Sequence, residues 1–518
     1  MSKPILTMDF ETDPFEHGRR VYPFACDVFD GEKHVSIWSR ACAPRIVKYL
    51  DTLEPSEIYM HNGGRFDIFF LFPWLEAQMR IINGRIVQAW LGKHEIKDSY
   101  AILPFPLKAY KKDDIDIDKL SRVRREDNKP EILSYLRGDT QYLRELVTSF
   151  RDEFGDFLTI GSAAMNQLRK FHPFDVGTKF LDAKFRSQFF FGGRVQCFKS
   201  GVIEQPFKIF DVNSMYPYVM KNFRHPTGIS HEVDRAITKN SYFVVAEGKQ
   251  LGNYGAFPLR NKRGGIDFNA ESGTFSCTIH EWNAALETGY FKPTRIVKTY
   301  GFPDSMCCDE FVDHFFAARL KAKLSDDKIH TIFYKLILNS AYGKFAQNPD
   351  NFFDFAITHR ERMASPWREH FIHEDGKYII WKKGVQRHSY YNVCIGASIT
   401  GAARSVLLRG IRKAIDPIYV DTDSIICSDL RDVPLHDATL GAWKLEATGN
   451  RIAIAGKKLY ACFNGETCVK KATKGARISA DEIIKVANGG TVLFKNAAPT
   501  FKLDGRVQFV KRRIKRTV

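Results

Sequence analysis

The stretch Ile415-Asp-Pro-Ile-Tyr-Val-Asp-Thr-Asp-Ser-Ile-Ile-Cys427 consists of two short apolar runs on either side of an acidic turn. This pattern predicts one strand over residues 415–420, a tight turn, and a second strand over residues 424–427. A hairpin of this kind would present the carboxylates of Asp421 and Asp423 together. A single Asp-x-Asp is also a common surface turn, because Asp side chains bond to nearby backbone groups. The turn needs partners elsewhere in the chain before it indicates chemistry.

A further carboxylate, Asp211, ends another apolar segment and is followed by Val212-Asn213-Ser214-Met215-Tyr216-Pro217. Carboxylates that hold two divalent cations about 3.5–4 Å apart can activate a hydroxyl and neutralise a leaving pyrophosphate. The order of these segments therefore makes the acids candidates for one shared two-metal site.

A helix is expected over about residues 328–345, between the two acidic segments. In it Lys335, Asn339 and Tyr342 stand at i, i+4 and i+7, so they share one face. A cation, an amide and an aromatic ring on one face suit a triphosphate, a sugar and a base. The alternative is an ordinary amphipathic helix. A preceding helix over residues 310–324 places Arg319 and Lys323 one turn apart, so both can face one ligand.

The bulk composition describes a globular chain with a basic excess. Its 518 residues suggest two to four domains, and 44% hydrophobic with 26% charged residues argues against disorder. The formal net charge is +17. A basic excess favours a polyanionic partner, although many basic proteins bind no nucleic acid. The basic C-terminal segment from Lys511 to Arg516 fits DNA contact or, alternatively, a solvated and partly frayed end.

Cysteine usage and the N-terminal segment predict a reduced, cytoplasmic setting. The ten cysteines include no C-x-x-C pair. The N-terminal segment is too short for a signal peptide, and its end is too acidic. No apolar run approaches the roughly 20 residues that span a bilayer. We expect a cytoplasmic protein with no membrane partner.

The N-terminal part predicts an α/β unit. A strand over residues 5–10 ends in acids, and a second over residues 58–60 leads into His61-Asn62-Gly63-Gly64. A helix is expected over residues 130–147, where apolar residues recur at helical spacing. A boundary is expected near residue 158, before a helical segment over residues 162–171.

The acidic segments and the helix between them resemble motifs A, B and C of family B DNA polymerases, in that order. Lys458-Leu459-Tyr460 is similar to the K-x-Y motif that follows motif C in this family. Four motif matches in the same order arise by chance far less often than a match to any single motif. The resemblance implies a right-hand palm, fingers and thumb, and template-directed DNA synthesis.

Three N-terminal segments resemble the exonuclease motifs of DnaQ-like proofreading domains. They are Asp9-Phe10-Glu11-Thr12, the stretch from Asn62 to Phe66-Asp67, and Tyr135-Leu-Arg-Gly-Asp139. The resemblance implies that the four acids Asp9, Glu11, Asp67 and Asp139 bind two metals and that Tyr135 orients the attacking water. Taken singly, each acid could instead cap a helix.

The detailed resemblance is to the protein-primed family B polymerases of bacteriophages. Asp98-Ser99-Tyr100-Ala-Ile-Leu-Pro-Phe-Pro106 is similar to their single-strand-binding segment, and Lys112-Asp-Asp-Ile115 is similar to their K-x-x-hydrophobic motif. Lys112 would stabilise charge on the scissile phosphate. Tyr100 stands where Leu is usual, and the second exonuclease motif is one residue longer than its tightest form. The implied ligands of a frayed primer end are Thr12, His61, Asn62, Phe66, Ser99 and Tyr100.

Phe190-Phe191-Gly192-Gly193 resembles the Y-x-G-G/A linker that joins the two activities and contacts the template. Phe190 replaces the usual Tyr, so a hydroxyl contact is lost. Additional sequence between the polymerase motifs resembles the two insertions of the protein-primed group. In that group the insertions hold the priming protein and encircle DNA. The alternative is a plain surface hairpin.

The predicted fold class is α/β and α+β multidomain: an RNase H-like (DnaQ-like) exonuclease domain followed by a polymerase domain with two insertions. The expected limits are 1–158 for the exonuclease and 159–518 for the polymerase. Within the polymerase we expect the palm at about 190–260 and 390–472, the first insertion at about 261–308, the fingers at about 315–347, the second insertion at about 348–389, and the thumb at about 473–518.

By resemblance, Asp211 and Asp423 bind both polymerase metals with the Val212 carbonyl, and Asp421 has a lesser role. Tyr216 would exclude a ribose 2′-hydroxyl, and Tyr342 would stack at the nascent pair. The remaining implied ligands are Lys335, Arg319, Lys323 and Asn339 for the nucleotide, and Phe190, Gly192, Gly193, Lys458 and Tyr460 for DNA.

The implied cofactor is Mg²⁺, two ions per active site, with Mn²⁺ as a substitute. The implied partners are DNA primer-template, single-stranded DNA, dNTPs, a terminal protein that supplies the first hydroxyl, and a single-stranded-DNA-binding protein. We expect a monomer. Two alternatives stay open: a family B polymerase that uses no terminal protein, and a catalytically inactive DNA-binding replication protein.

Overall fold

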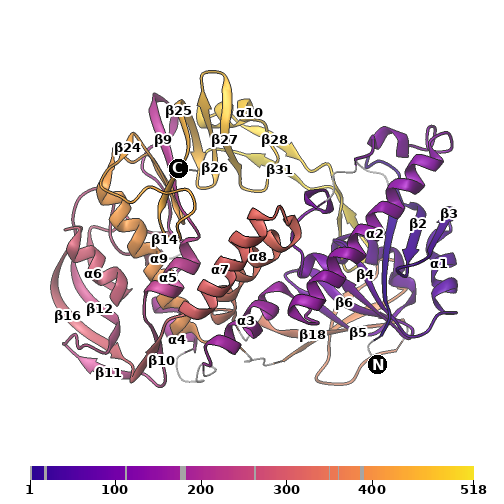
Figure 1. Cartoon of the computed structure of the whole chain (residues 1–518), viewed down its shortest axis with the longest axis horizontal. Coiled ribbons are helices and arrows are strands. Elements are labelled where there is room, and N and C mark those ends of the chain that lie inside the picture. The colour runs from indigo at the N-terminus through magenta and orange to yellow at the C-terminus, as the bar shows by residue number, and fades with distance from the viewer. Residues whose placement is uncertain are drawn as a thin grey trace.

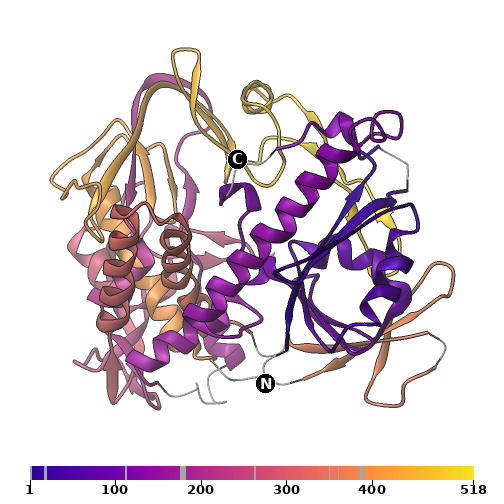
Figure 2. The ribbon, with the colours of Figure 1, turned by 45° about the vertical axis from the view of Figure 1, so that its right-hand side comes forward.

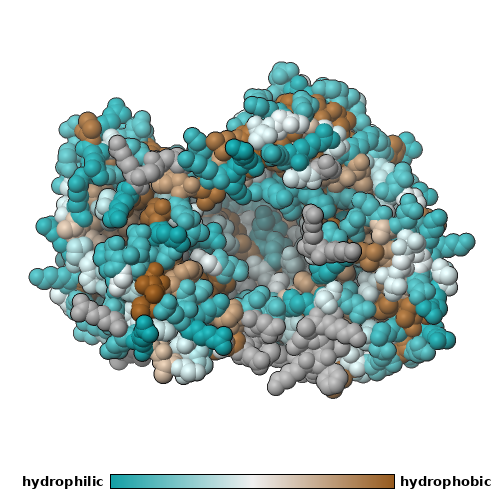
Figure 3. Space-filling model, turned by 180° about the vertical axis from the view of Figure 1, so that it is seen from behind, coloured by the Kyte–Doolittle hydropathy of each residue, from teal (hydrophilic) through white to brown (hydrophobic). Residues whose placement is uncertain are grey.

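The computed structural model describes residues 3–16, 20–110, 114–174, 182–261, 264–348, 351–359, 361–385 and 390–517. Its N-terminal unit lies on the right of Figure 1, and the remaining units surround the helix pair at the centre and form the left side. From behind, the space-filling view shows a hollow in the middle of the molecule (Figure 3). Within the described ranges, no helix is long and apolar enough to cross a membrane.

The N-terminal unit is a mixed sheet with helices on its faces, as the sequence predicts. Strand β1 (Ile5–Thr12) pairs in parallel with β4 (Glu57–Met60), which pairs in parallel with β7 (His94–Asp98). The other elements of this unit are β2 (Pro23–Phe29), β3 (His34–Trp38), β5 (Leu75–Ile82), β6 (Arg85–Leu91), α1 (Cys42–Leu50), α2 (Lys129–Phe154) and the short 3₁₀ helices η1 (Gly63–Arg65), η2 (Asp67–Trp74), η3 (Ser99–Ala101), η4 (Leu107–Ala109) and η5 (Ile117–Leu120).

The region expected to hold the second insertion extends this same sheet. Its strands are β18 (Phe353–Thr358), β19 (Arg368–Ile372) and β20 (Ile379–Gly384). Strand β18 pairs antiparallel with β5, from Phe355 opposite Met79 to Ile357 opposite Ala77. The result is one ten-stranded sheet of order β19-β20-β18-β5-β6-β7-β4-β1-β2-β3. Figure 2 shows these later strands beside the N-terminal sheet. This hairpin is therefore part of a sheet and is not a free surface loop.

Helix α2 confirms the predicted helix and continues it to Phe154. Pro130 stands in its first turn, and Gly155 follows with φ of 94°, a conformation that favours glycine. In the added turns, Phe150 and Phe154 pack against Phe333, with Phe150 and Phe333 ring centres 5.4 Å apart. The N-terminal unit and the central helices therefore share one core.

The central helices also follow the predicted periodicity. Asp327 caps α8 by accepting a bond from the His330 N–H, which accounts for the break between α7 and α8. Helix α9 is buried along nearly its whole length. The helices are α3 (Ile160–Phe171), α4 (Asp182–Phe189), α5 (Met215–Asn222), α7 (Asp309–Leu324), α8 (Lys328–Phe345) and α9 (Val393–Lys413).

A seven-stranded antiparallel sheet carries the acidic turn. Its order is β27-β26-β25-β9-β23-β22-β8. The prediction of one strand over residues 415–420 is wrong, because Asp416 has φ of 50° and Pro417 has no N–H for a ladder. The strands of this sheet are β8 (Val195–Cys197), β9 (Gly201–Val212), β22 (Tyr419–Asp421), β23 (Ser424–Cys427), β25 (Trp443–Gly456), β26 (Leu459–Asn464) and β27 (Thr467–Thr473). Strands β21 (Ala414–Ile415) and β24 (Asp429–Leu430) pair separately.

A separate four-stranded sheet of order β11-β16-β12-β15 adjoins α6. A boundary at residue 261 would divide it, because β12 pairs with both β15 and β16. The elements here are β10 (His225–Thr227), β11 (His231–Asp234), β12 (Ser241–Gln250), β13 (Leu259–Arg260), β14 (Ile266–Asp267), β15 (Ser272–Thr278), β16 (Phe291–Gly301), β17 (Asp304–Met306) and α6 (Ile279–Glu287).

The C-terminal segment reaches back to the N-terminal unit. The frayed-end alternative is wrong for residues 511–514, which form β31 and pair with β28. The Phe501 ring packs against Phe66 and Phe69, with ring centres 5.2 Å and 5.3 Å away. The elements are α10 (Ala480–Ala487), β28 (Val492–Lys495), β29 (Thr500–Phe501), β30 (Val507–Gln508) and β31 (Lys511–Ile514).

Candidate active sites

The turn between β22 and β23 brings three carboxylates to one end of the seven-stranded sheet. Thr422 has φ of 59°, and the Asp423 N–H donates to the Asp421 carbonyl at 2.6 Å, so the turn is tight. Strand β9 runs beside it, with Asp211 opposite Ser424 in register. The Val212 N–H donates to the Asp423 carbonyl at 2.9 Å. We call this group of acids the palm site.

The carboxylates of Asp211 and Asp423 are partly buried, and their negative charges repel each other. Burial and the neighbouring charge of Asp423 raise the pKa of Asp211 to about 7. Burial also raises the pKa of Asp423, with the charge of Asp421 adding to it. Asp211 lies near the end of β9 and Asp423 in the turn just before β23, where a bound cation would relieve the repulsion.

Asp421 differs from its neighbours because it already has a cation. Lys458 Nζ lies 3.0 Å from Asp421 Oδ1, and the Tyr419 hydroxyl donates to Oδ2 at 3.3 Å. The Lys458 backbone N–H donates in turn to the Tyr419 hydroxyl at 2.9 Å. Tyr460 is buried and its ring lies 4.9 Å from that of Tyr419. The K-x-Y segment therefore packs on the acidic turn.

Two tyrosines from separate helices close the space next to the palm site. Tyr216 on α5 and Tyr342 on α8 stack with ring centres 3.9 Å apart and planes 7° from parallel. Burial raises the pKa of Tyr216, and the Tyr342 ring beside it adds to the shift. Both hydroxyls are therefore protonated at neutral pH.

The expected triphosphate ligands lie on α7 and α8. Lys323, Lys335 and Asn339 are exposed, whereas Arg319 is half-buried and burial lowers its pKa. Within the described ranges none of these three cations has a carboxylate partner. Cations left without a counter-charge are suited to an anionic ligand.

The Phe190–Gly193 linker is held by a residue that the sequence analysis missed. Arg404 on α9 donates to the Phe191 and Gly192 carbonyls at 2.6 and 2.7 Å. It also forms a two-bond ion pair with Glu281 at 2.7 and 3.0 Å. The available signal was the first arginine of α9, which follows a run of small and apolar residues from Val393 to Ala403. Phe190 itself is half-buried, and its carbonyl accepts a bond from Arg260.

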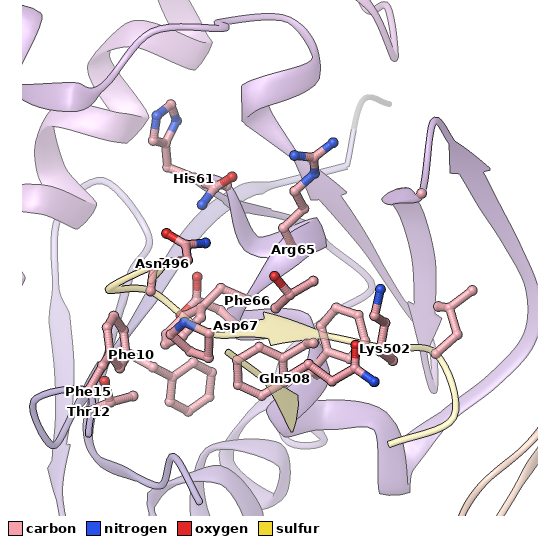
Figure 4. Close-up of a pocket in the computed structure, with 18 of the residues that line it drawn as sticks. Phe10, Thr12, Phe15, His61, Arg65, Phe66, Asp67, Asn496, Lys502 and Gln508 are labelled. Atoms are coloured by element: carbon pink, nitrogen blue, oxygen red, sulfur yellow. The ribbon is translucent and has the colours of Figure 1, made fainter. Parts of the chain in front are cut away.

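A second group of acids lines a cavity of about 1560 Å³ in the N-terminal unit (Figure 4). We call it the N-terminal cavity. Asp9 and Glu11 project from β1, Asp67 begins η2, and Tyr135 and Asp139 lie one turn apart on α2. Residues more than 100 positions apart in the chain are therefore brought into one cavity, as the three motifs predict.

The acids of this cavity perturb one another strongly. Burial, followed by the charges of Asp67, Glu11 and Asp139, raises the pKa of Asp9 well above its ordinary value. Burial raises the pKa of Glu11 and of Asp67 to about 8. Tyr135 hydrogen-bonds to Asp139. Perturbed acids gathered in a cavity are typical of functional sites.

The donor chemistry of both sites suits hard divalent cations, which prefer carboxylate oxygen. Nevertheless, across the described ranges no three acidic, His or Cys side chains already stand close enough to hold an ion. The charges of neighbouring acids raise the pKa of Asp9 and that of Asp211, as expected where carboxylates lie near one another. The side chains therefore fit such ions by type, and binding would draw them together.

Four of the six expected single-strand ligands line this cavity, and the other two, Ser99 and Tyr100, lie beside His61. Thr12, His61, Asn62 and Phe66 line it. The His61 ring nitrogens lie 3.0 Å from Ser99 Oγ and 2.9 Å from the Phe105 carbonyl oxygen, and burial lowers the pKa of His61 to about 4. The Tyr100 ring centre is 5.6 Å from that of His61. Lys112 lies outside the described residues.

The cavity has a wall that the sequence analysis missed entirely. Residues from the distant C-terminal segment complete it, among them Asn496, Phe501, Lys502 and Gln508. No motif marks them, and they are more than 350 positions away from the acids. Only the return of the chain to the N-terminal unit brings them here.

The chain resembles known DNA polymerases over its full length. Residues 105–383 match the family model described as DNA polymerase type B, organellar and viral. A DNA-directed DNA polymerase of Enterobacteria phage PRD1 is 47% identical, over 99% of this chain and 98% of the relative. The DNA polymerase of Bacillus phage phi29 is 25% identical, over 78% of this chain and 77% of the relative.

The fold is also similar to that of a solved structure. Phi29 DNA polymerase complexed with primer-template DNA and incoming nucleotide superposes with a TM-score of 0.77 at 20% identity, covering all of both chains. The predicted fold class of exonuclease plus palm, fingers and thumb is therefore confirmed.

Gly193→Ala should destabilise the protein, because the added Cβ would lie 2.8 Å from Thr422 in the acidic turn. Overpacking of this kind costs about 1–3 kcal/mol of unfolding free energy, measured by denaturant titration. Gly192→Ala is the matched control, since nothing lies within 4 Å of its added Cβ. Equal stability of the two variants would contradict the packing described for the linker.

Proposed function

The chain belongs to the type B DNA polymerases of organelles and viruses, and from this premise we propose that one chain both extends and degrades a DNA 3′ end. It is a DNA-directed DNA polymerase. The proposal adds a 3′-5′ exonuclease in the N-terminal cavity. The observation that carries it is the gathering of Asp9, Glu11, Asp67 and Asp139 around one cavity, in which the pKa values of the first three are raised.

Extension takes place at the palm site. Asp211 and Asp423, with the Val212 carbonyl, would hold two Mg²⁺ ions, for which Mn²⁺ substitutes. The bound ions would activate the 3′-hydroxyl and neutralise pyrophosphate. Arg319, Lys323 and Lys335, the cations without a carboxylate partner, orient the triphosphate, and Asn339 lies on the same face as Lys335. Lys458 releases Asp421 as it takes hold of the primer strand beside Tyr460.

The Tyr216–Tyr342 stack gives this site its sugar selectivity. The two rings lie in contact next to the palm site, where an incoming base and sugar would pack against them. Tyr342 then stacks at the new pair while Tyr216 lies under the sugar. A 2′-hydroxyl would collide with the Tyr216 ring, so the product is DNA.

Degradation takes place in the N-terminal cavity. The four acids would hold two Mg²⁺ ions that activate water, and Tyr135 orients that water through its bond to Asp139. Lys112 stabilises charge on the scissile phosphate. Phe66 stacks on an unpaired base, which is worth roughly 1–3 kcal/mol. Thr12, His61, Asn62, Ser99 and Tyr100 hold the frayed strand.

The second insertion and the thumb are proposed to enclose DNA. The Glu374 N–H donates to the Asp504 carbonyl at 3.1 Å, and Gly505 packs on His373. The tip of the thumb therefore touches the turn after β19. Contact between the thumb and the second insertion supports processive synthesis with strand displacement, because DNA enclosed by them cannot dissociate sideways from the enzyme. A single-stranded-DNA-binding protein would cover the displaced strand.

The first acceptor is proposed to be a Ser, Thr or Tyr hydroxyl on a terminal protein. The 47% identity to a phage polymerase supports a phage-type replicon. The enzyme would then work as a monomer in the host cytoplasm. The alternative is a polymerase that extends an ordinary primer and uses no terminal protein.

Asp423→Ala should abolish nucleotide incorporation and leave degradation of single-stranded DNA unchanged. Conversely, Asp9→Ala with Glu11→Ala should stop degradation while extension survives. Each change removes charge from one metal site only. Both activities are measured on the same labelled oligonucleotide with Mg²⁺. Loss of both activities in either properly folded variant would contradict the proposal of two separate sites. Nucleotide incorporation by Asp423→Ala would contradict the assignment of Asp423 to the polymerase site.

Tyr216→Val should admit ribonucleotides, because the smaller side chain leaves room for a 2′-hydroxyl. We expect discrimination against rNTPs to fall by about tenfold or more, since each 1.4 kcal/mol of contact is a factor of ten. Single-nucleotide insertion with matched dNTP and rNTP measures it. Unchanged sugar preference would remove Tyr216 from this role.

Incubation with labelled dATP and the proteins of the replicon tests priming. A covalently labelled protein that depends on intact Asp423 is the expected result. The control is Asp423→Ala, which should label nothing. Efficient extension of a DNA primer with no labelled protein would favour the alternative without a terminal protein.

A further inference from the structure

One arginine outside every expected set contacts the single-strand ligands. Arg85 begins β6, and its guanidinium pairs with the buried carboxylate of Asp98 at the end of β7. A second guanidinium nitrogen donates to the Asn62 side-chain oxygen at 3.0 Å. The guanidinium carbon lies 4.4 Å from the centre of the Tyr100 ring. One side chain therefore touches two of the expected strand-binding residues.

The same arginine lies where this chain departs from the family pattern. Tyr100 stands where Leu is usual, and the guanidinium covers its ring. The longer turn of the second exonuclease motif fits because Gly64 has no side chain: a Cβ there would lie 1.9 Å from the Ile86 carbonyl oxygen. The Gly64 N–H donates to Asp98 at 3.2 Å. Tyr100 and the longer turn at Gly64 therefore both pack around the Arg85–Asp98 pair.

The bond from Arg85 also fixes how Asn62 is presented. Asn62 has φ of 60°, in the left-handed region that non-glycine residues adopt rarely. A guanidinium only donates, so the Asn62 side-chain oxygen must face it, and this sets the orientation of the amide. The amide nitrogen is then left to donate to a strand in the cavity that Asn62 lines.

We propose that Arg85 is the positioning residue of the single-strand site: it orients the Asn62 amide and holds the Tyr100 ring for the last nucleotides of a DNA 3′ end. Its side chain is only 12% exposed, so its main effect is through these two neighbours. The planar guanidinium can bond to two partners while it stacks on a third, which a lysine cannot do. This inference rests on the proposed exonuclease function.

Arg85→Lys is the main test, because it keeps a cation for the buried Asp98 and so protects the fold. The lysine cannot also bond Asn62 and cover Tyr100. Degradation of a labelled single-stranded oligonucleotide should show a KM about tenfold higher, the size of one lost base contact, with kcat within about twofold. Primer extension on matched primer-template should be unchanged, which reports that the protein is folded.

Arg80→Lys is the matched control: Arg80 is exposed on the neighbouring strand β5, and its side chain forms no hydrogen bond or ion pair among the described residues. It should leave KM unchanged. In a background with Asn62→Ala and Tyr100→Leu, Arg85→Lys should have no further effect, because both residues it acts through are gone. An unchanged KM, or an equal rise in that background, would overturn the inference. Absence of degradation by the unaltered enzyme would instead refute the proposed exonuclease.

Discussion

One buried guanidinium joins the parts of the polymerase half. Arg404 is only 3% exposed, and its bonds reach two structural units: two go to Glu281 at the start of α6 and two to carbonyls of the Phe190–Gly193 linker. Gly193 then packs against Thr422 in the acidic turn. Leaving either charge of a buried pair without its partner costs about 3–5 kcal/mol. The position of the linker relative to the palm site depends on this pair.

The N-terminal unit is held to the polymerase part of the chain in a different way. Strand β18 extends the N-terminal sheet, and Phe501 of the C-terminal segment packs beside Phe66. The N-terminal unit, the β18 region and the C-terminal segment therefore together form the N-terminal cavity that contains the four acids. Phe150 of α2 and Phe333 of α8 lie in one shared core, which joins the N-terminal unit to the central helices. The second set of carboxylates therefore belongs to a unit that is packed against the rest of the chain.

Short motifs with local chemistry could be predicted from the sequence. The helices around Tyr135 and Lys335 follow from apolar periodicity, and the order of the acidic segments indicates the family. The break at Asp416–Pro417 was missed because the run is otherwise apolar. Arg404, Arg85 and Phe501 were missed for another reason: each acts through partners brought near by the fold, and no local pattern distinguishes it from an ordinary surface arginine or core phenylalanine.

The central claim is that one chain carries two separate two-metal sites. Diffraction at the manganese absorption edge would test it, with the enzyme bound to primer-template, Mn²⁺ and a non-hydrolysable dNTP in one crystal and to single-stranded DNA in another. We predict two ions about 3.5–4 Å apart between Asp211 and Asp423 in the first crystal, and two among Asp9, Glu11, Asp67 and Asp139 in the second. Manganese missing from either set of acids, or bound in a third place instead, would contradict the account.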